Sequence, residues 1–417
     1  MKLDLDQLIN ALSSTVDLVS VDEKQHGKRV AYMILACAEK LGCSRKEKTM
    51  LFRMGLLHDC GVSSTKVHRH IIDELEWSGA DHHCRIGEDR LRRFAPLAPL
   101  ADAVRYHHTR WPVLQEMELP ESIKRQASLI FLMDRVDAMT TLQHPTSRLI
   151  VKDKVCSKID SLRHSYFDPE LVDSFLDASD TDAFWITMEP AFLEDFLLNH
   201  PLGSDEIVID FDGLYTIASI FAEIVDAKSP YTAEHSHGVA SLARFLAEKC
   251  GLSQSVCRKL EVAGLLHDLG KLQVPDPILE YRGSLSREET ATMHHHSYVT
   301  HQILNKVHGL QDIALWASNH HEKLDGSGYP HRRTAESLTI ESRIIMIADI
   351  FQALAQNRPY RVSQPPEIII DILKQGAARH QLDAGVVSLV EAELESCYTI
   401  ATTPWANSNG DASRIWL

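Results

Sequence analysis

Residues 264–271 read GLLHDLGK, and residues 55–62 read GLLHDCGV. The two stretches differ only at their sixth and eighth positions and lie 209 residues apart. At the same offset, AEKLGCS at 38–44 falls on AEKCGLS at 247–253. Self-similarity at a fixed offset is typical of a repeated structural unit. We therefore interpret the chain as an internal duplication.

The repeat preserves polar residues in a constant register. In both halves 32 residues separate the first two of these histidines, and 24 separate the third from the pair that follows. The first set is His26, His58, Asp59, His83, His107, His108 and Asp134, and the second is His235, His267, Asp268, His296, His320, His321 and Asp349. Buried imidazoles and carboxylates need partners, and a metal ion satisfies several of them together.

The make-up of each set indicates the kind of metal site. Seven donors are too many for one ion with an open position, so we expect two divalent ions that share a carboxylate in the second half. No cysteine belongs to either set, which argues against structural zinc, and we favour iron, manganese or nickel over zinc. Adjacent residues on a helix point about 100° apart, so His267 and Asp268 should lie near a helix end.

The secondary structure is predicted to be helical. Apolar residues recur at helical spacing over 214–228. Ser253 can cap one helix, and Ser286 with Glu289 forms a capping box that opens the helix carrying His296. Long strand-like alternation is absent. We predict an all-α fold of two tandem helical bundles.

Composition bounds the class of protein. The chain has 417 residues and a net charge of −15, which argues against binding to long nucleic acids. It has no signal peptide and no apolar run of about 18 residues, so we expect no membrane span and a cytoplasmic location. The eight cysteines form no CxxC pair, which suits a reducing compartment. We place the domains at 1–200 and 206–417, joined by the linker-like NHPLGSDE at 199–206.

Longer motifs in the second half resemble a known family. HDLGK at 267–271, together with HHEKLDGSGYP at 320–330, resembles the HD-GYP family, the branch of the HD superfamily that hydrolyses cyclic dinucleotides, chiefly cyclic di-GMP. The stretches at 229–240, 293–304 and 348–361 resemble the other motifs of this family. The resemblance covers about the last half of the chain, and the first half looks like an HD domain without the GYP motif.

The resemblance implies a role for each matching residue. One ion would be held by His235, His267, Asp268 and Asp349, and the other by Asp268, His296, His320 and His321. A hydroxide activated by the ions would attack phosphorus in line. With His267 and Asp268 as catalytic residues, Lys271 would neutralise phosphate charge or assist the leaving 3′-oxygen. Substrate contacts would come from Lys271, Asp325, Gly328, Tyr329, Arg358 and Arg361.

Some positions depart from the family pattern. Tyr231 stands where a glutamate is common, and Gln352 stands where an aspartate is common. We therefore expect two metal ions rather than three, and a linear 5′-phosphorylated dinucleotide rather than mononucleotides as the product. The remaining histidines of this half match no family role, so surface positions are expected for His237, His294, His295, His301 and His308.

The first half keeps the ligands and lacks the apparatus for substrate. Val62 replaces Lys271, HHTRWP at 107–112 lacks the GYP loop, and nothing basic matches the RPYR arginines. Asp22 is a candidate extra ligand. Three interpretations stay open: a metal-binding regulatory domain, of which a di-iron oxygen or redox sensor is one form; a structural relic; and a second active site for another phosphate ester.

The sequence therefore predicts a metal-dependent phosphodiesterase acting on cyclic di-GMP or 3′,3′-cyclic GMP-AMP. Two alternatives remain. One is a phosphohydrolase of nucleotides or phosphomonoesters, and the other is a non-hydrolytic signalling platform that binds a dinucleotide. Apart from the substrate, the partners considered are a second copy of the chain and a signalling protein.

Overall fold

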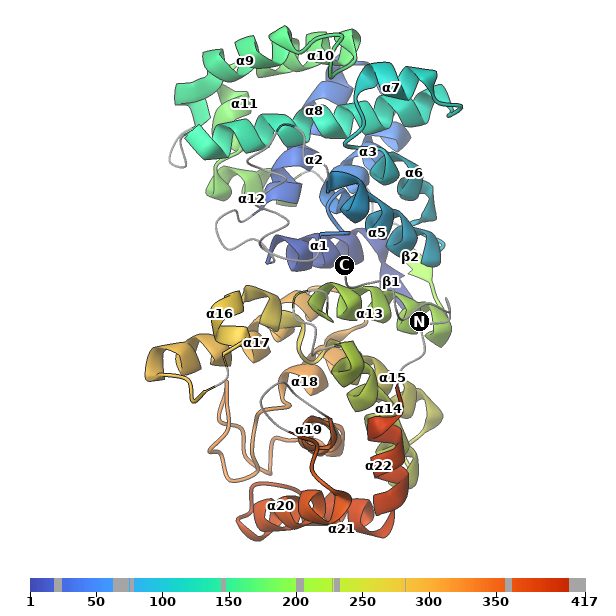
Figure 1. The fold of residues 1–417 in the computed structure, drawn as a ribbon, viewed down its shortest axis with the longest axis vertical. Helices are drawn as coiled ribbons and strands as arrows, with labels where there is room; N and C mark the ends of the chain where they lie inside the picture. The colour runs from blue at the N-terminus through green and yellow to red at the C-terminus, as the bar shows by residue number, and fades with distance from the viewer. Residues whose placement is uncertain are drawn as a thin grey trace. The chain divides into compact units, whose positions relative to one another are not determined.

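The chain forms two compact units (Figure 1). The N-terminal unit is Lys2–Val208, and the C-terminal unit is Ile209–Leu417 together with Met1. The computed structural model describes residues 1–18, 25–62, 75, 79–143, 148–199, 206–226, 228, 233–281, 283–356 and 362–404.

The N-terminal unit is helical, as expected. Its α-helices are α1 (Leu5–Asp17), α2 (His26–Lys40), α3 (Arg45–Leu57), α5 (Ala80–Arg93), α6 (Ala101–Arg105), α7 (Trp111–Glu116), α8 (Glu121–Gln143), α9 (Lys152–Ser161), α10 (Pro169–Ser179), α11 (Asp182–Thr187) and α12 (Pro190–Asn199), with the 3-10 turns η1 (Ala98–Leu100) and η2 (Arg148–Val151). A two-stranded antiparallel sheet pairs β1 (Lys2–Asp4) with β2 (Glu206–Val208), with Leu3 opposite Ile207. Apart from this sheet, the described residues bear out the all-α prediction.

The C-terminal unit is also helical. Its α-helices are α13 (Phe211–Asp226), α14 (Ala233–Lys249), α15 (Gln254–Leu266), α16 (Asp276–Leu279), α17 (Arg287–Leu304), α18 (Gln311–Ser318), α19 (Ile340–Ala355), α20 (Pro366–Ala378), α21 (Ala384–Ala392) and α22 (Leu394–Thr402), with the 3-10 turn η3 (Leu269–Gln273). The predicted caps are confirmed. Ser253 caps α15, and Ser286 forms a capping box with Glu289 at the start of α17.

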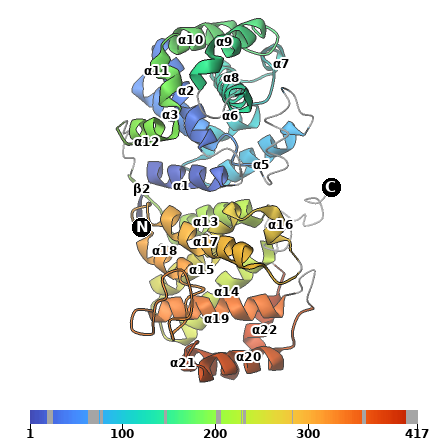
Figure 2. The ribbon, with the colours of Figure 1, turned by 90° about the vertical axis from the view of Figure 1, so that its left-hand side faces the viewer.

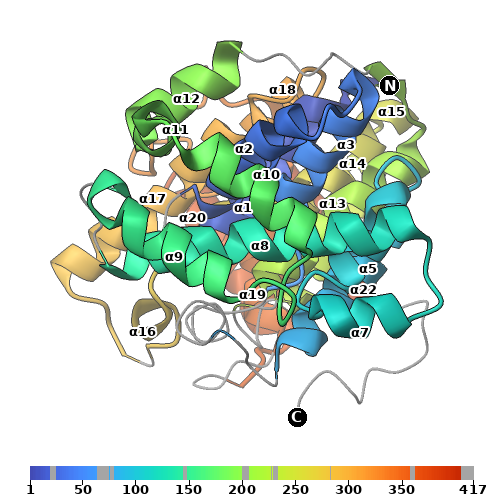
Figure 3. The ribbon, with the colours of Figure 1, turned by 90° about the horizontal axis from the view of Figure 1, so that it is seen from above.

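Both units are built on the same packing pattern. In the N-terminal unit α2 packs against α3, α8 and α10 (Figure 3). In the C-terminal unit α14 packs against α15, α19 and α22 (Figure 2). The matching helices α2 and α14 therefore each pack against two matching partners, α3 or α15 and α8 or α19, as an internal duplication requires.

Two pairs of matched glycines explain why the GLLHD–G block recurs. A Cβ at Gly264 would lie 2.6 Å from the Cα of Ala240, and one at Gly55 would lie 2.7 Å from the Cα of Ala31. Only glycine therefore permits these two helix pairs to approach so closely. The second glycine of the block, six residues later, also allows a close backbone approach. A Cβ at Gly270 would meet the carbonyl oxygen of the third histidine in its unit at 2.0 Å, and one at Gly61 at 1.9 Å.

A helix that spans a bilayer needs about 20 consecutive, mostly apolar residues. Across the described parts of the chain, no helix is both long enough and apolar enough to span a membrane.

Candidate metal centre

The C-terminal unit brings all seven predicted ligands into one buried pocket. His235 lies on α14, His296 on α17 and Asp349 on α19, and the pair His320–His321 follows α18 directly. His267 is the C-cap of α15 and Asp268 precedes η3, so these two adjacent ligands lie at a helix end, as predicted. Ligand atoms of His235, His267 and Asp268 lie within 4.8 Å of one another, as do those of His296, His320 and His321.

Hydrogen bonds settle which nitrogen carries the proton in three of the imidazoles. The Nδ1 atoms of His267, His296 and His320 lie 2.8, 2.6 and 2.7 Å from the carbonyl oxygen three residues earlier. A carbonyl oxygen only accepts, so each Nδ1 donates. Burial lowers the pKa of His296 and of His320, so Nε2 of these two rings presents a lone pair to the pocket. The Nε2 atoms of His296 and His320 lie 3.0 Å apart. Two facing lone pairs at this distance repel each other unless a cation lies between them.

Asp268 lies between the two groups of histidines. Its Oδ2 is 3.2 Å from the Nε2 of His267 and 3.8 Å from that of His235. Its Oδ1 is 3.6 Å from the Nε2 of His296 and 3.7 Å from that of His320, and has no hydrogen-bond partner among the described residues. Such a carboxylate fits a pair of divalent ions that share it.

The protonation states favour metal ligation. Burial opposes charge on Asp268, but His267 and Lys271 outweigh burial and hold the pKa of this carboxyl well below its usual range. Burial is the main reason that the pKa falls to about 3 at His296 and to about 4 at His321. At neutral pH the pocket therefore offers an ionised carboxylate at Asp268 and neutral imidazoles at His296 and His321, which are the forms that bind metal ions.

Lys271 reaches the pocket from its more open side. Its Nζ lies 2.5 Å from Asp268 Oδ2, and its side chain is 18% exposed. The ammonium therefore contacts the shared carboxylate and can also meet an anion that enters from solvent.

The GYP segment folds back onto the histidine pair. The backbone N–H of Tyr329 donates to the carbonyl of His321 at 3.1 Å, and the two rings lie 4.8 Å apart between centroids. The Tyr329 ring also stacks on His294, with centroids 3.7 Å apart and an angle of 11° between planes. Burial raises the pKa of Tyr329, and the charges of Asp268 and Asp349 add to the shift, so the hydroxyl stays protonated.

Glu322 holds this segment in place, and the sequence analysis missed it. Its carboxylate is fully buried and accepts hydrogen bonds from the backbone N–H groups of His331 at 2.7 Å and Arg333 at 2.9 Å. A Cβ at Gly328 would lie 2.5 Å from the backbone of Glu322, so this glycine allows close packing. Asp325 is exposed and accepts hydrogen bonds from the N–H and Oγ of Ser327, so its oxygens shape the turn. The signal for Glu322 was an acidic residue next to the histidine pair without an assigned role.

Several predicted positions differ from expectation or lie outside the described residues. His237 was expected at the surface but is 3% exposed, because it lies on the inner face of α14 near the hydroxyl of Tyr215. Gln352 hydrogen-bonds with its amide oxygen to Nδ1 of His235 and so orients that ligand. Arg358, Arg361, Tyr231 and Asp22 lie outside the described residues.

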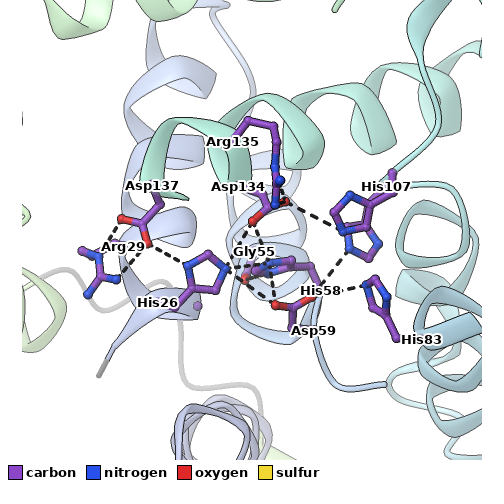
Figure 4. A network of polar contacts seen from close by, with 12 residues as sticks. His26, Arg29, Gly55, His58, Asp59, His83, His107, Asp134, Arg135 and Asp137 are labelled. Atoms are coloured by element: carbon purple, nitrogen blue, oxygen red, sulfur yellow. Dashed lines mark hydrogen bonds and ion pairs between the residues drawn. The ribbon is translucent and has the colours of Figure 1, made fainter. Parts of the chain in front are cut away.

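The N-terminal unit contains a second pocket built from the matching seven residues (Figure 4). Asp59 Oδ2 lies 3.5 Å from the Nε2 of His58 and 3.7 Å from that of His26. Asp59 Oδ1 lies 3.5 Å from the Nε2 of His83 and 3.7 Å from that of His107. The ligand atoms of Asp59, His83, His107 and His108 all lie within 4.8 Å of one another. The shared aspartate is therefore repeated as well.

Comparison with known proteins agrees with this duplication. Family models described as HD domain match residues 24–139 and 219–386. The chain is 35% identical over 415 residues to 3′3′-cGAMP-specific phosphodiesterase 1 of Vibrio cholerae, covering 97% of this chain and 96% of the relative. It is 36% identical over 210 residues to 3′3′-cGAMP-specific phosphodiesterase 3 of the same organism, covering 50% of this chain and 46% of that one.

The chain belongs to the HD-GYP family. A crystal structure of a cyclic GMP-AMP-specific phosphodiesterase from Vibrio cholerae superposes with a TM-score of 0.67, covering 95% of this chain and 98% of that one at 24% identity. At this identity the superposition supports the fold alone. It agrees with the helical fold of this HD-GYP protein.

The two pockets of this HD-GYP protein differ in the residues that surround the ligands. In the N-terminal unit, Asp137 lies 2.7 Å from Nδ1 of His26 and receives hydrogen bonds from Arg29 at 2.6 and 2.8 Å. The aligned positions in the C-terminal unit are Gln352 for Asp137 and Gly238 for Arg29. A Cβ at Gly238 would lie 2.7 Å from Gln352 Nε2. The N-terminal unit thus has a buried Arg29–Asp137 ion pair. At the matching positions the C-terminal unit has Gln352, whose side chain packs against Gly238.

Proposed function

We propose that the C-terminal unit hydrolyses 3′,3′-cyclic GMP-AMP to the linear 5′-phosphorylated dinucleotide. The observation that carries this proposal is the contact of Asp268 with both histidine groups and with Lys271. The relative that spans almost the whole chain is named as a 3′3′-cGAMP-specific phosphodiesterase. That name favours the mixed dinucleotide over cyclic di-GMP, which names other relatives of the C-terminal unit.

Two divalent ions fit the seven donors of the C-terminal pocket, with iron, manganese or nickel favoured over zinc. Bound there, such ions would supply Lewis acidity and lower the pKa of coordinated water. The orphaned Oδ1 of Asp268 and the facing Nε2 atoms of His296 and His320 support this assignment.

The chain's own residues have separate tasks in this proposal. Asp268 and Asp349 keep the pocket anionic and hold its imidazoles in place. Lys271 would donate a hydrogen bond to a phosphate oxygen or to the departing 3′-oxygen, because its ammonium lies on the open side of Asp268. Tyr329, with a protonated hydroxyl, would donate to the substrate. Hydrolysis adds one water across one P–O3′ bond, which leaves a 3′-hydroxyl and a 5′-phosphate.

The second candidate is hydrolysis of phosphomonoesters. The GYP segment argues against it, because a loop anchored on Glu322 and lined by Tyr329 suits a larger ligand than a single phosphate. We also propose that the protein acts in the cytoplasm, since its cysteines are free thiols.

The test is turnover by the full-length chain loaded with manganese or iron(II). Equal concentrations of 3′,3′-cyclic GMP-AMP, cyclic di-GMP, cyclic di-AMP and p-nitrophenyl phosphate are supplied, and products are identified by mass spectrometry. We expect fastest loss of the mixed dinucleotide and a linear product with one added water. Cleavage of the phosphomonoester with all cyclic dinucleotides intact would overturn the proposal. Asp268→Asn should abolish turnover, while the matched Asp59→Asn should retain it.

A further inference from the structure

The N-terminal pocket, like the C-terminal one, contains buried polar atoms that lack hydrogen-bond partners among the described residues and that a cation would satisfy. Neither carboxylate oxygen of Asp59 has a hydrogen-bond partner among the described residues, and the same is true of Nε2 of His107 and of His108. All of these side chains are at least nine-tenths buried. Buried polar atoms in this state are costly, because nothing replaces the water they lose on folding.

The imidazoles of this pocket are also oriented for ligation. His58 and His107 donate from Nδ1 to carbonyl oxygens at 2.8 and 2.6 Å, so Nε2 is the nitrogen of each ring that remains for a metal ion. Nε2 of His26 lies 3.2 Å from Nε2 of His58. Asp137 accepts from the opposite side of the His26 ring, as a carboxylate typically does behind a metal-bound histidine.

Arg135 covers Asp134 in the N-terminal unit, and the C-terminal unit has no arginine at the matching position. The Arg135 guanidinium donates to Asp134 Oδ2 at 2.8 and 3.1 Å, and its side chain is 2% exposed. Asp134 is then 1% exposed, whereas the matching Asp349 is 11% exposed and has Ile350 in the place of Arg135. Figure 4 shows Arg135 lying against Asp134 on the side away from Asp59.

Features that would handle a substrate are absent from the described N-terminal residues at the matching positions. Val62 is buried where Lys271 reaches the opening, and Thr109 stands where Glu322 anchors the GYP segment. A metal centre here would therefore have ligands but no cation at the position of Lys271 to bind a phosphate.

We propose that the N-terminal unit holds a metal centre of its own, in which two divalent first-row ions share Asp59 and which does not hydrolyse phosphodiesters. One ion takes His26, His58, Asp59 and Asp134, and the other takes Asp59, His83, His107 and His108. Arg29 and Arg135 balance the charges of Asp137 and Asp134, so the ions compensate Asp59 and the imidazole lone pairs.

Metal content of matched variants tests this centre in the full-length chain. The protein is loaded with manganese(II), freed of excess metal by gel filtration and analysed by mass spectrometry for metal per chain. We expect about four ions in the wild type and about two in the double variant His267→Gln/Asp268→Asn, which lacks the C-terminal ligands. Complete loss of metal in that variant would overturn the proposal.

The reciprocal variant His58→Gln/Asp59→Asn should bind about two ions and keep turnover within about twofold of wild type. Loss of turnover in a folded form of this variant would contradict a non-hydrolytic role. If the double variant does not fold, His83→Gln alone should reduce the metal content by about one ion. An unchanged metal content in that variant would count against the centre.

A second measurement does not depend on stoichiometry. Manganese ions that share a carboxylate are magnetically coupled, so the His267→Gln/Asp268→Asn variant should show an exchange-coupled paramagnetic resonance signal. Uncoupled six-line spectra alone would contradict sharing of Asp59. These readouts do not use the cyclic dinucleotide, so they can fail or succeed independently of the proposed function.

Discussion

At the scale of single residues, the two pockets differ by a lysine and an arginine placed on different carboxylates. Lys271 contacts the shared Asp268 and remains partly exposed. Arg135 contacts the unshared Asp134 and is buried. A cation that reaches solvent can meet a phosphate, whereas one enclosed in an ion pair only neutralises its partner. This difference explains why the GLLHD–G block ends in lysine in one unit alone.

Replacing Lys271 by methionine should lower kcat about 100-fold while metal content stays unchanged, because a charge that stabilises the reacting phosphate is lost. Hydrolysis of 3′,3′-cyclic GMP-AMP and metal per chain are measured on the same preparation. Lys306→Met, at an exposed position on the same unit, is the control and should behave as wild type. A loss of metal in Lys271→Met would instead assign the lysine to the assembly of the site.

The buried His237 should make the stability of the C-terminal unit depend on acidity. Burial lowers the pKa of His237 to about 4, from about 6.5 when it is unfolded. The folded form therefore binds fewer protons than the unfolded form between pH 6.5 and 4, so stability falls as the pH falls through this window. The full effect is about 3 kcal/mol. Urea unfolding in EDTA at pH 7 and pH 4.5 should show a smaller loss for His237→Gln than for wild type. Equal losses would contradict this assignment.

At the scale of elements, the GYP segment depends on one buried carboxylate for its shape. The Glu322 carboxylate accepts hydrogen bonds from the backbone N–H groups of His331 and Arg333. Among the described side chains, no other acceptor is seen for these two groups. Thr109 aligns with Glu322 but has a single neutral hydroxyl, so it cannot provide two charged acceptor oxygens. The anchor is therefore present only where the substrate loop is present.

Glu322→Ala should raise KM for the cyclic dinucleotide and lower kcat/KM about tenfold or more, because the loop loses two charge-assisted hydrogen bonds. Metal content should be unaffected. Glu322→Gln, which keeps one acceptor oxygen, should fall between alanine and wild type. Steady-state kinetics measure this series, with the exposed Glu336→Gln as control. A change confined to kcat, with KM constant, would argue against a role in shaping the loop.

How much of these elements the sequence predicts depends on the range of the interaction. Caps such as Ser253 and Ser286 act over three residues, so local pattern predicts them correctly. The histidines and aspartates that the structure brings together were predicted because the duplication repeats their spacing. The Arg29–Asp137 pair spans 108 residues and is invisible to local pattern. The sequence does contain a hint of this pair, because both of its members differ between the halves. Arg29 aligns with Gly238, and Asp137 aligns with Gln352. The burial of His237 was missed because the sequence alone did not place it on the inner face of α14.

At the scale of the whole molecule, duplication has given one chain two pockets with the same donors and different surroundings. The C-terminal pocket orients His235 with the neutral Gln352, and the N-terminal pocket orients His26 with the ionised Asp137. A carboxylate behind a metal-bound histidine strengthens the ligand, and such outer partners typically change metal affinity 10- to 100-fold. The N-terminal centre should therefore hold its metal more tightly than the C-terminal pocket, to which we assign hydrolysis.

Graded removal of metal from the whole chain checks this order. During dialysis against increasing EDTA, hydrolysis of 3′,3′-cyclic GMP-AMP should disappear while about half of the bound metal remains, because the C-terminal ions leave first. Asp137→Asn gives His26 an amide partner like the one beside His235. In this variant activity and the bound metal should be lost at more similar EDTA concentrations than in the wild type. Parallel loss of activity and metal in the wild type would mean that Asp137 does not strengthen the N-terminal centre. Activity that survives until the last metal is removed would mean that the affinities have the opposite order.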